Sequence, residues 1–252
     1  MCTFAHKLNE MFGIFSKKTF LRDLIPDGHV DIHCHVLPGI DDGATTVEDS
    51  LLLIESLKKL GITHCIATPH IMGNTWENTP ERISSAYKKI TEPTKLPLSL
   101  GYAAEYMIDP NFTKLYQTEP LLTLKDNYVL VEISYLNPPV QLFDILFELQ
   151  VAGYQPVLAH PERYIYYHKK FDQYHRIKNA GCMMQLNLLS TVGYYGPVVA
   201  EASLKLLKAG LIDFVGSDVH HDKHLLAFDQ KTLVKDLKPL HEAIANNQFF
   251  KR

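Results

Sequence analysis

The 252-residue sequence is poor in cysteine and has no excess of positive charge. Its four cysteines, Cys2, Cys34, Cys65 and Cys182, form no C-x-x-C pair, which argues against a disulfide framework and a cysteine-rich zinc site. With 25 Lys and Arg against 28 Asp and Glu, the chain lacks the basic surface typical of nucleic-acid binding. No stretch approaches the roughly 20 apolar residues that span a bilayer. These absences predict a cytoplasmic protein that binds no nucleic acid and has no transmembrane segment.

Two common phosphate-handling motifs are also missing. No cysteine is followed six positions later by arginine, which excludes the C-x5-R loop of cysteine-dependent tyrosine phosphatases. The chain has no G-x-x-x-x-G-K-[ST] loop, which argues against the common nucleotide hydrolases. Phosphate chemistry in this chain would therefore depend on bound metal.

From residue 29 onward, short apolar segments alternate with amphipathic ones. Strands are expected at residues 29–36, 63–70, 96–106, 128–134, 155–160, 183–189 and 212–220. Helices are expected at residues 45–60, 79–90, 138–152, 197–209 and 237–246, and Thr45 with Glu48 is expected to form a capping box for the first. The pattern predicts a single α/β domain over residues 29–252, folded as a distorted (β/α)7 TIM-like barrel after an N-terminal extension over residues 1–28. An open doubly wound sheet is the alternative.

Nearly every expected strand ends in a side chain that can bind metal. In a parallel barrel these ends meet at one mouth, so the side chains would converge there. A single histidine or glutamate at a strand end more often has an ordinary solvated or hydrogen-bonded role, but so many at successive strand ends indicate a metal site. Imidazoles mixed with carboxylates suit Mn²⁺, Fe or Zn²⁺. The candidate ligands are His33, His35, Asp42, His70, Glu105, Glu132, His160, Asp218 and His220.

Other residues near these strand ends have two interpretations. Asp31 lies on the same strand face as His33, where it either orients an imidazole or is a buried, hydrogen-bonded aspartate without a metal role. Cys34 and Cys65 are expected to be small buried apolar residues. Six tyrosines either form an aromatic wall for a phosphoester or belong to the ordinary core and surface. They are Tyr135, Tyr164, Tyr166, Tyr167, Tyr194 and Tyr195.

Four motifs resemble those of a known family. "DIHCHVLPGIDDGA", "ATPH", "LAHPERY" and "GSDVH" are similar to the polymerase and histidinol phosphatase (PHP) superfamily. Within it they most resemble the bacterial manganese-dependent protein-tyrosine phosphatases that accompany capsule and exopolysaccharide tyrosine kinases. The resemblance covers about residues 30–221 and implies three divalent ions, with Mn²⁺ first and Fe or Zn²⁺ as alternatives. It implies one ion at His33, His35, Glu105 and Asp218, a second at Glu105, Glu132 and His160, and a third at Asp42, His70 and His220.

The resemblance also implies how substrate is held. Arg163 matches the family's phosphate-binding arginine, and Arg163, Asp218 and His220 are the expected catalytic residues. Members usually carry another arginine a few residues beyond S-D-x-H, whereas this chain reads "SDVHHDKHLLAF". Lys223, His221 or His224 would have to replace it, although lysine lacks the bidentate fork of arginine.

The expected function is phosphomonoester hydrolysis by a metal-activated hydroxide. The expected substrate is a phosphotyrosine protein, namely the tail of a tyrosine kinase involved in capsule or exopolysaccharide synthesis. The alternatives are a small-molecule phosphatase such as histidinol phosphatase, a phosphodiesterase, and a non-catalytic module that binds and regulates a kinase tail. A homo-oligomer is left open by the sequence.

Overall fold

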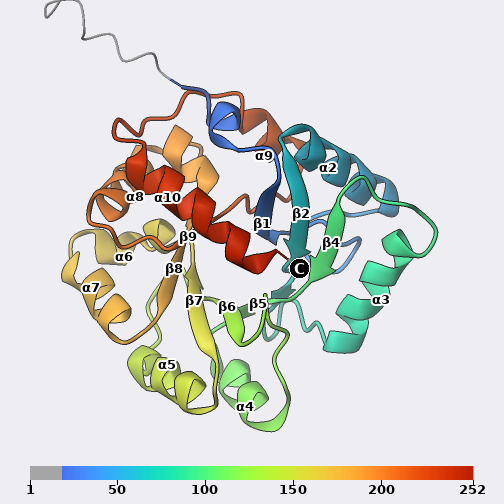
Figure 1. Ribbon diagram of the computed structural model, residues 1–252. Coiled ribbons are helices and arrows are strands. Elements are labelled where there is room, and N and C mark those ends of the chain that lie inside the picture. Colours follow the sequence, from blue (N-terminus) through green and yellow to red (C-terminus); the bar gives the residue numbers. More distant parts are fainter. Residues whose placement is uncertain (1–18, 252) are drawn as a thin grey trace, which may run out of the picture.

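The structure, a computed structural model, describes residues 19–251, and residues 1–18 of the expected extension lie outside this range. Figure 1 shows the strands at the centre of the molecule and helices around them. The strands are β1 (His29–Cys34), β2 (Ile62–Ala67), β3 (His70–Ile71), β4 (Ser99–Tyr102), β5 (Glu105–Met107), β6 (Tyr128–Glu132), β7 (Gln155–Ala159), β8 (Met183–Asn187) and β9 (Phe214–Gly216). Each of the seven expected strand regions is therefore present, and two of them are split into two strands.

The order of the strands in space follows their order along the chain. β1, β2 and β4 form one parallel sheet, and β3, β5, β6, β7, β8 and β9 form a second. The Ala103 amide donates to the Ala67 carbonyl (2.8 Å) where the first sheet gives way to the second. At the other edge, Cys34 and Val219 form a parallel bridge that joins β1 to the segment after β9. This circular order without a reversal confirms the distorted (β/α)7 prediction over the open doubly wound sheet, whose strand order reverses at a switch point.

Each helix that the sequence pattern predicts is present. These helices are α2 (Val47–Lys59), α3 (Pro80–Thr91), α5 (Leu142–Val151), α8 (Pro197–Lys208) and α10 (Lys238–Asn246). The helical segments that were not predicted are η1 (Leu21–Leu24), α4 (Pro110–Thr118), η2 (Pro161–Arg163), α6 (Ile165–His168), α7 (Asp172–Asn179), η3 (Leu188–Val192), α9 (Asp222–Ala227) and η4 (Asn247–Phe250). Across the described range, no helix is both long and apolar enough to cross a membrane.

The capping box of α2 lies one residue later than predicted. The Asp49 amide donates to Thr46 Oγ1, and the Thr46 amide donates to Asp49 Oδ2, both at 3.1 Å. The prediction of Thr45 and Glu48 was wrong because the sequence Thr45-Thr46-Val47-Glu48-Asp49 offers the same capping pattern in two registers.

The C-terminal segment closes the amino-terminal end of the barrel. Phe250 of η4 is buried against Val30 and Leu130, which point into the barrel interior. The Asn247 side chain donates to the carbonyls of Val30 (2.8 Å) and Val215 (2.9 Å) and accepts the Val215 amide (3.1 Å). The apolar side chains fill this end, so the polar side chains of the strands gather at the opposite, carboxyl end.

Part of the expected N-terminal extension packs against the barrel domain. Leu21 of η1 is fully buried, and its amide donates to the Gln230 carbonyl (2.9 Å). The Thr232 amide donates to the Thr19 carbonyl at the same distance of 2.9 Å. The division of the chain into an extension over residues 1–28 and a domain over residues 29–252 stays a proposal.

Candidate metal centre

The nine candidate ligands come together at the carboxyl end of the barrel. His33 Nε2 lies 3.1 Å from Glu105 Oε2 and 3.2 Å from Asp218 Oδ1, although these residues belong to β1, β5 and the segment after β9. His160 Nε2, which follows β7, lies 3.0 Å from Glu105 Oε1. His70 Nδ1 faces Glu132 Oε1 at 3.0 Å. The convergence at one mouth that the sequence predicts is thus present in the structure.

These residues form four overlapping groups whose ligand atoms lie within 4.8 Å of one another. The groups contain the same residues as the three expected ligand sets but divide them differently. His35 lies also with the set expected at the third ion, His70 lies also with Glu105 and Glu132, and His160 lies with His33 and Glu105 rather than with Glu132. The four groups are His35, Asp42, His70 and His220; His33, His35 and Asp218; His33, Glu105 and His160; and His70, Glu105 and Glu132.

Two residues of the site have left-handed backbone conformations, which are unfavourable for residues other than glycine. His160 has φ of 34° and Asp218 has φ of 50°. Such conformations cost on the order of 1–3 kcal/mol each and tend to occur at functional sites, where surrounding structure holds them. Gly216 lets β9 approach β1 closely, because a Cβ there would lie 2.7 Å from the Cβ of His33 and 2.4 Å from Gln185 Nε2.

The donor set fits divalent cations. His33 Nδ1 lies 2.8 Å from Gln185 Oε1, and His35 Nδ1 lies 2.9 Å from Asp41 Oδ2, so both rings donate from Nδ1. When the rings are neutral, as metal binding requires, each Nε2 carries a lone pair, yet the two Nε2 atoms lie only 3.2 Å apart and face carboxylate oxygens. Hydrogen-bond acceptors that lie against one another in a buried site repel, and a bound cation offsets this repulsion. Nitrogen and oxygen ligands without a thiolate suit Mn²⁺, Fe or Zn²⁺.

The charges in the site act strongly on one another. Burial lowers the pKa of His33, but the charges of Glu105 and Asp218 outweigh burial and raise it well above the usual value. Burial likewise raises the pKa of Glu105, but His33, His70 and His160 together hold it well below the usual range. Burial also raises the pKa of Asp218, but His33 and His220 hold it well below the usual range, so both carboxylates stay ionised at neutral pH and available to a cation.

Arg163 lies beside this cluster at the wall of a cavity of about 390 Å³. Its Nη1 donates to Asp218 Oδ2 (2.9 Å), and its guanidinium carbon lies 4.8 Å from the Tyr135 ring centre and 4.4 Å from that of Tyr195. Such contacts hold a planar cation in one orientation. The cavity is lined by Asp42, His70, Met72, Trp76, Met107, Glu132, Tyr135, His160, Arg163, Tyr195, Asp218, His220, His221 and His224.

The residues expected to replace the second arginine have different positions. Lys223 is exposed on α9, and the described residues that line the cavity do not include it. His224 lines the cavity and accepts the His220 amide at Nδ1 (3.1 Å). Burial and the neighbouring His221 and His220 lower the pKa of His224 to about 4, so its ring is neutral at pH 7. The substrate-binding roles of Lys223 and His224 stay predictions.

Asp31, the two cysteines and the six tyrosines singled out in the sequence have different surroundings in the structure. Asp31 accepts hydrogen bonds from the Ser217 amide (3.0 Å) and hydroxyl and contacts no imidazole nitrogen, which favours the structural interpretation. Cys34 and Cys65 are buried. Of the six tyrosines, Tyr135 and Tyr195 line the cavity, whereas Tyr164 and Tyr167 belong to the core.

Sequence reasoning missed the residues that orient the candidate ligands. Gln185 and Asp41 hold the His33 and His35 rings, and Asn187 Nδ2 donates to Asp218 Oδ2 (2.8 Å) and to the Tyr195 hydroxyl (3.0 Å). Gln185 and Asn187 alternate with apolar residues in "MMQLN", and this polar alternation in a buried strand was the available signal.

Comparisons with known proteins agree with this site and fold. Residues 29–227 match the protein family described as "Capsular polysaccharide synthesis, CpsB/CapC". The chain is 32% identical over 198 residues to tyrosine-protein phosphatase YwqE of Bacillus subtilis, covering 77% of this chain and 78% of YwqE.

Two solved structures have a similar fold. One, reported for YwqE from Bacillus subtilis and CpsB from Streptococcus pneumoniae, "unique metal-dependent tyrosine phosphatases", matches with a TM-score of 0.73 and 28% identity over 88% of each chain. The histidinol phosphate phosphatase of Lactococcus lactis matches with a TM-score of 0.50 and 14% identity over 88% of this chain and 93% of that one, and this likeness concerns the fold alone. The chain therefore belongs to the CpsB/CapC family of capsular polysaccharide synthesis, as its motifs, its barrel and its cluster of histidines and carboxylates indicate.

Proposed function

We propose that this protein is a metal-dependent protein-tyrosine phosphatase acting on a bacterial tyrosine kinase of capsule or exopolysaccharide synthesis. The observation that carries the proposal is the position of Arg163, at the wall of the same cavity as the candidate metal ligands. The printed names of the relatives and the description of the family support the choice of substrate.

The nine candidate ligands would hold three divalent cations, with Mn²⁺ the first choice. When bound, such cations lower the pKa of a coordinated water and offset the negative charge of a phosphoryl group. The chain's own contribution is orientation, because Gln185 and Asp41 hold the His33 and His35 rings with Nε2 toward the cluster.

Arg163 would bind the nonbridging oxygens of the phosphoryl group. One of its five N–H groups is used by Asp218, and its side chain is 23% exposed, so other donors remain for a substrate. Tyr135 and Tyr195 hold the guanidinium plane and form the cavity wall on which the aromatic ring of phosphotyrosine would pack.

His220 is expected both to bind metal and, as a catalytic residue, to protonate the leaving oxygen of the phosphoester, and these two roles exclude each other. Its Nδ1 donates to the Asp218 carbonyl (2.9 Å), which leaves only Nε2, and Nε2 faces Asp42 Oδ1 at 3.4 Å. A nitrogen that binds metal cannot also protonate the leaving oxygen, so we assign His220 to metal binding. The phenol of tyrosine has a pKa of about 10 and leaves readily as phenolate. His221, which lines the cavity, is the alternative proton donor.

A test compares a phosphotyrosine peptide with histidinol phosphate as substrates for metal-stripped protein reconstituted with Mn²⁺, Fe²⁺ or Zn²⁺. We expect peptide hydrolysis that needs added metal and is lost in His35→Ala but kept in His175→Ala, since His175 is exposed on α7. Hydrolysis of histidinol phosphate alone would favour the small-molecule phosphatase. Metal binding without hydrolysis of either substrate would favour the non-catalytic kinase-binding module.

A further inference from the structure

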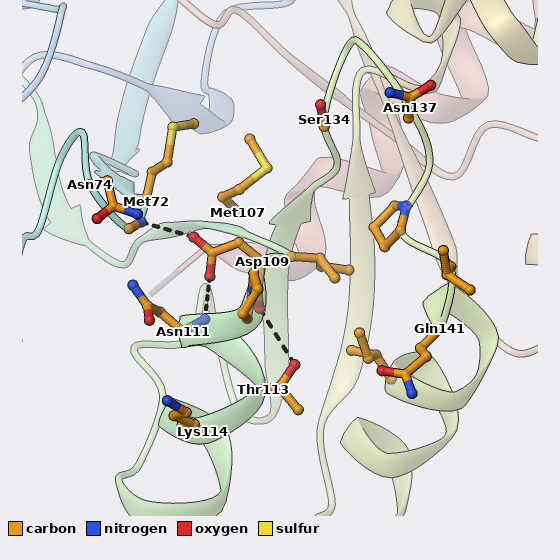
Figure 2. A pocket seen from close by; sticks show the side chains of 16 residues that line it. Met72, Asn74, Met107, Asp109, Asn111, Thr113, Lys114, Ser134, Asn137 and Gln141 are labelled. Atoms are coloured by element: carbon orange, nitrogen blue, oxygen red, sulfur yellow. Dashed lines mark hydrogen bonds between the residues drawn. The ribbon is translucent and has the colours of Figure 1, made fainter.

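A second and larger cavity lies beside the candidate metal centre. It has a volume of about 840 Å³ and lies between α4 and the segment 134–141 that precedes α5. Met72 and Met107 line both this cavity and the metal-side cavity. Figure 2 shows both methionines at one end, with Asn137 and Gln141 across the cavity from Asp109 and Thr113. The two cavities are therefore neighbours that share a wall.

We propose that this larger cavity, the flank groove, binds the polypeptide segment adjoining the phosphotyrosine of the substrate, an inference that rests on the proposed phosphatase function. The phosphoryl group and the tyrosine ring would occupy the metal-side cavity. The substrate chain would then pass Met72 and Met107 and lie extended between α4 and the segment 134–141.

The polar groups of the flank groove suit a peptide backbone. Asn74, Asn111, Asn137 and Gln141 line it and are exposed, and within the described residues their side-chain amides form no hydrogen bond. An amide side chain offers both a donor and an acceptor, as a peptide backbone does. Four such groups along one groove match the alternating N–H and C=O groups of an extended chain.

The flank groove carries little charge, which argues against a nucleic acid as its occupant. The carboxylate of Asp109 is used by three backbone amides, those of Gly73 (2.9 Å), Asn111 (2.8 Å) and Phe112 (2.9 Å). Lys114 is then the one charged side chain among the described lining residues without such neutralisation. A single cation is too few for a nucleic-acid backbone, which binds through several phosphate contacts.

The apolar part of the flank groove is exposed to solvent. Val140 lines it and is fully exposed, and Leu136 of the same segment is 83% exposed. Half-buried Met72 extends this apolar surface, and the largely buried Met107 and Ile145 line the groove beneath it; methionine adapts to side chains of different shape. Exposed apolar surface continuous with a catalytic cavity is typical of a substrate-binding site rather than of plain surface.

The experiment compares kcat/KM for free phosphotyrosine and for a phosphotyrosine peptide with uncharged flanking residues. Val140→Glu places a charge in the groove, and Val151→Glu is the matched control, since Val151 is 71% exposed at the end of α5 and does not line the groove. We expect the reconstituted wild type to prefer the peptide, and Val140→Glu to lower peptide kcat/KM about tenfold, chiefly through KM, because the groove then exposes a charge to the peptide. Free phosphotyrosine should be hydrolysed equally by all three proteins.

The outcomes separate this inference from the proposed function. If the wild type hydrolyses neither compound, the proposed phosphatase function fails. If it hydrolyses both and Val140→Glu behaves as Val151→Glu does, the function stands and the flank groove is refuted. If Val140→Glu slows both substrates equally, the change acts on the metal-side cavity and the inference is also overturned. A change in oligomeric state with unaltered peptide kinetics would assign the groove to a second copy of the chain instead.

Discussion

The replacement of Arg163 by lysine tests whether the shape of the guanidinium, rather than its charge alone, is needed for catalysis. Lysine keeps the positive charge but loses the planar fork that forms two parallel hydrogen bonds with a phosphoryl group. It also loses the two ring contacts, at 4.8 Å and 4.4 Å, that hold the guanidinium between Tyr135 and Tyr195. One charge-assisted hydrogen bond contributes about 1.5–3 kcal/mol, which corresponds to a loss of about 10- to 150-fold in kcat/KM.

The assay is hydrolysis of a phosphotyrosine peptide by Arg163→Lys loaded with the same metal as the wild type. Arg176→Lys is the matched control, because Arg176 also lies over an aromatic ring, that of Phe143 at 4.5 Å, but does not line the metal-side cavity. The control should keep wild-type kcat/KM. Wild-type activity in Arg163→Lys would refute the reasoning, since charge alone would then be enough.

Three other predictions concern orientation, pH and capping. Gln185→Leu should weaken metal binding by about 10- to 100-fold, because the His33 ring loses its partner at 2.8 Å; titration against a chromophoric chelator measures this, and unchanged affinity would contradict it. Burial raises the pKa of Glu162 from 4.5 to about 7, so the folded state holds this proton more tightly than the unfolded chain, and stability is lost as pH rises from 4.5 through 7. Urea unfolding of the metal-free protein should show the wild type losing about 3 kcal/mol relative to Glu162→Gln over that range, whereas a difference independent of pH would refute the assignment. Thr46→Ala should cost about 1 kcal/mol in the free energy of unfolding through loss of the hydrogen bond from the Asp49 amide, and Thr45→Ala should cost much less; equal losses would contradict this cap.

The strands and the candidate ligands were predictable because both depend on local pattern and simple topology. Alternating apolar segments give strands whatever their neighbours are, and parallel strands in a barrel bring their carboxyl ends together. His33 and Asp218 are 185 positions apart in the sequence, yet this rule alone predicted that they meet. The distance of 3.2 Å between His33 Nε2 and Asp218 Oδ1 could be obtained only from the structure.

The features that were missed depend on contacts between distant segments. The break between β2 and β3 at Thr68 and Pro69 has no periodic signal, because it follows from hydrogen bonds with neighbouring strands. α6 has four residues and no side-chain cap, so neither periodicity nor capping marks it. The pairing of His35 with Asp41 was unpredictable for the same reason, since the adjacent Asp42 is chemically equivalent in the sequence.

The contacts of Asn247 with β1 have a consequence for the synthesis of the chain. The hydrogen bond from Asn247 to the Val30 carbonyl joins residues 217 positions apart. At the usual rates of translation, about 10–40 s pass between the appearance of the first residue and that of the second. Throughout this interval the Val30 carbonyl lacks this partner, and until Val219 is made β1 also lacks its neighbour on the side away from β2, so this strand edge is open to pairing with other nascent chains. Because His220 is also made late, the expected third ion site, which needs Asp42, His70 and His220, is complete only in a nearly finished chain.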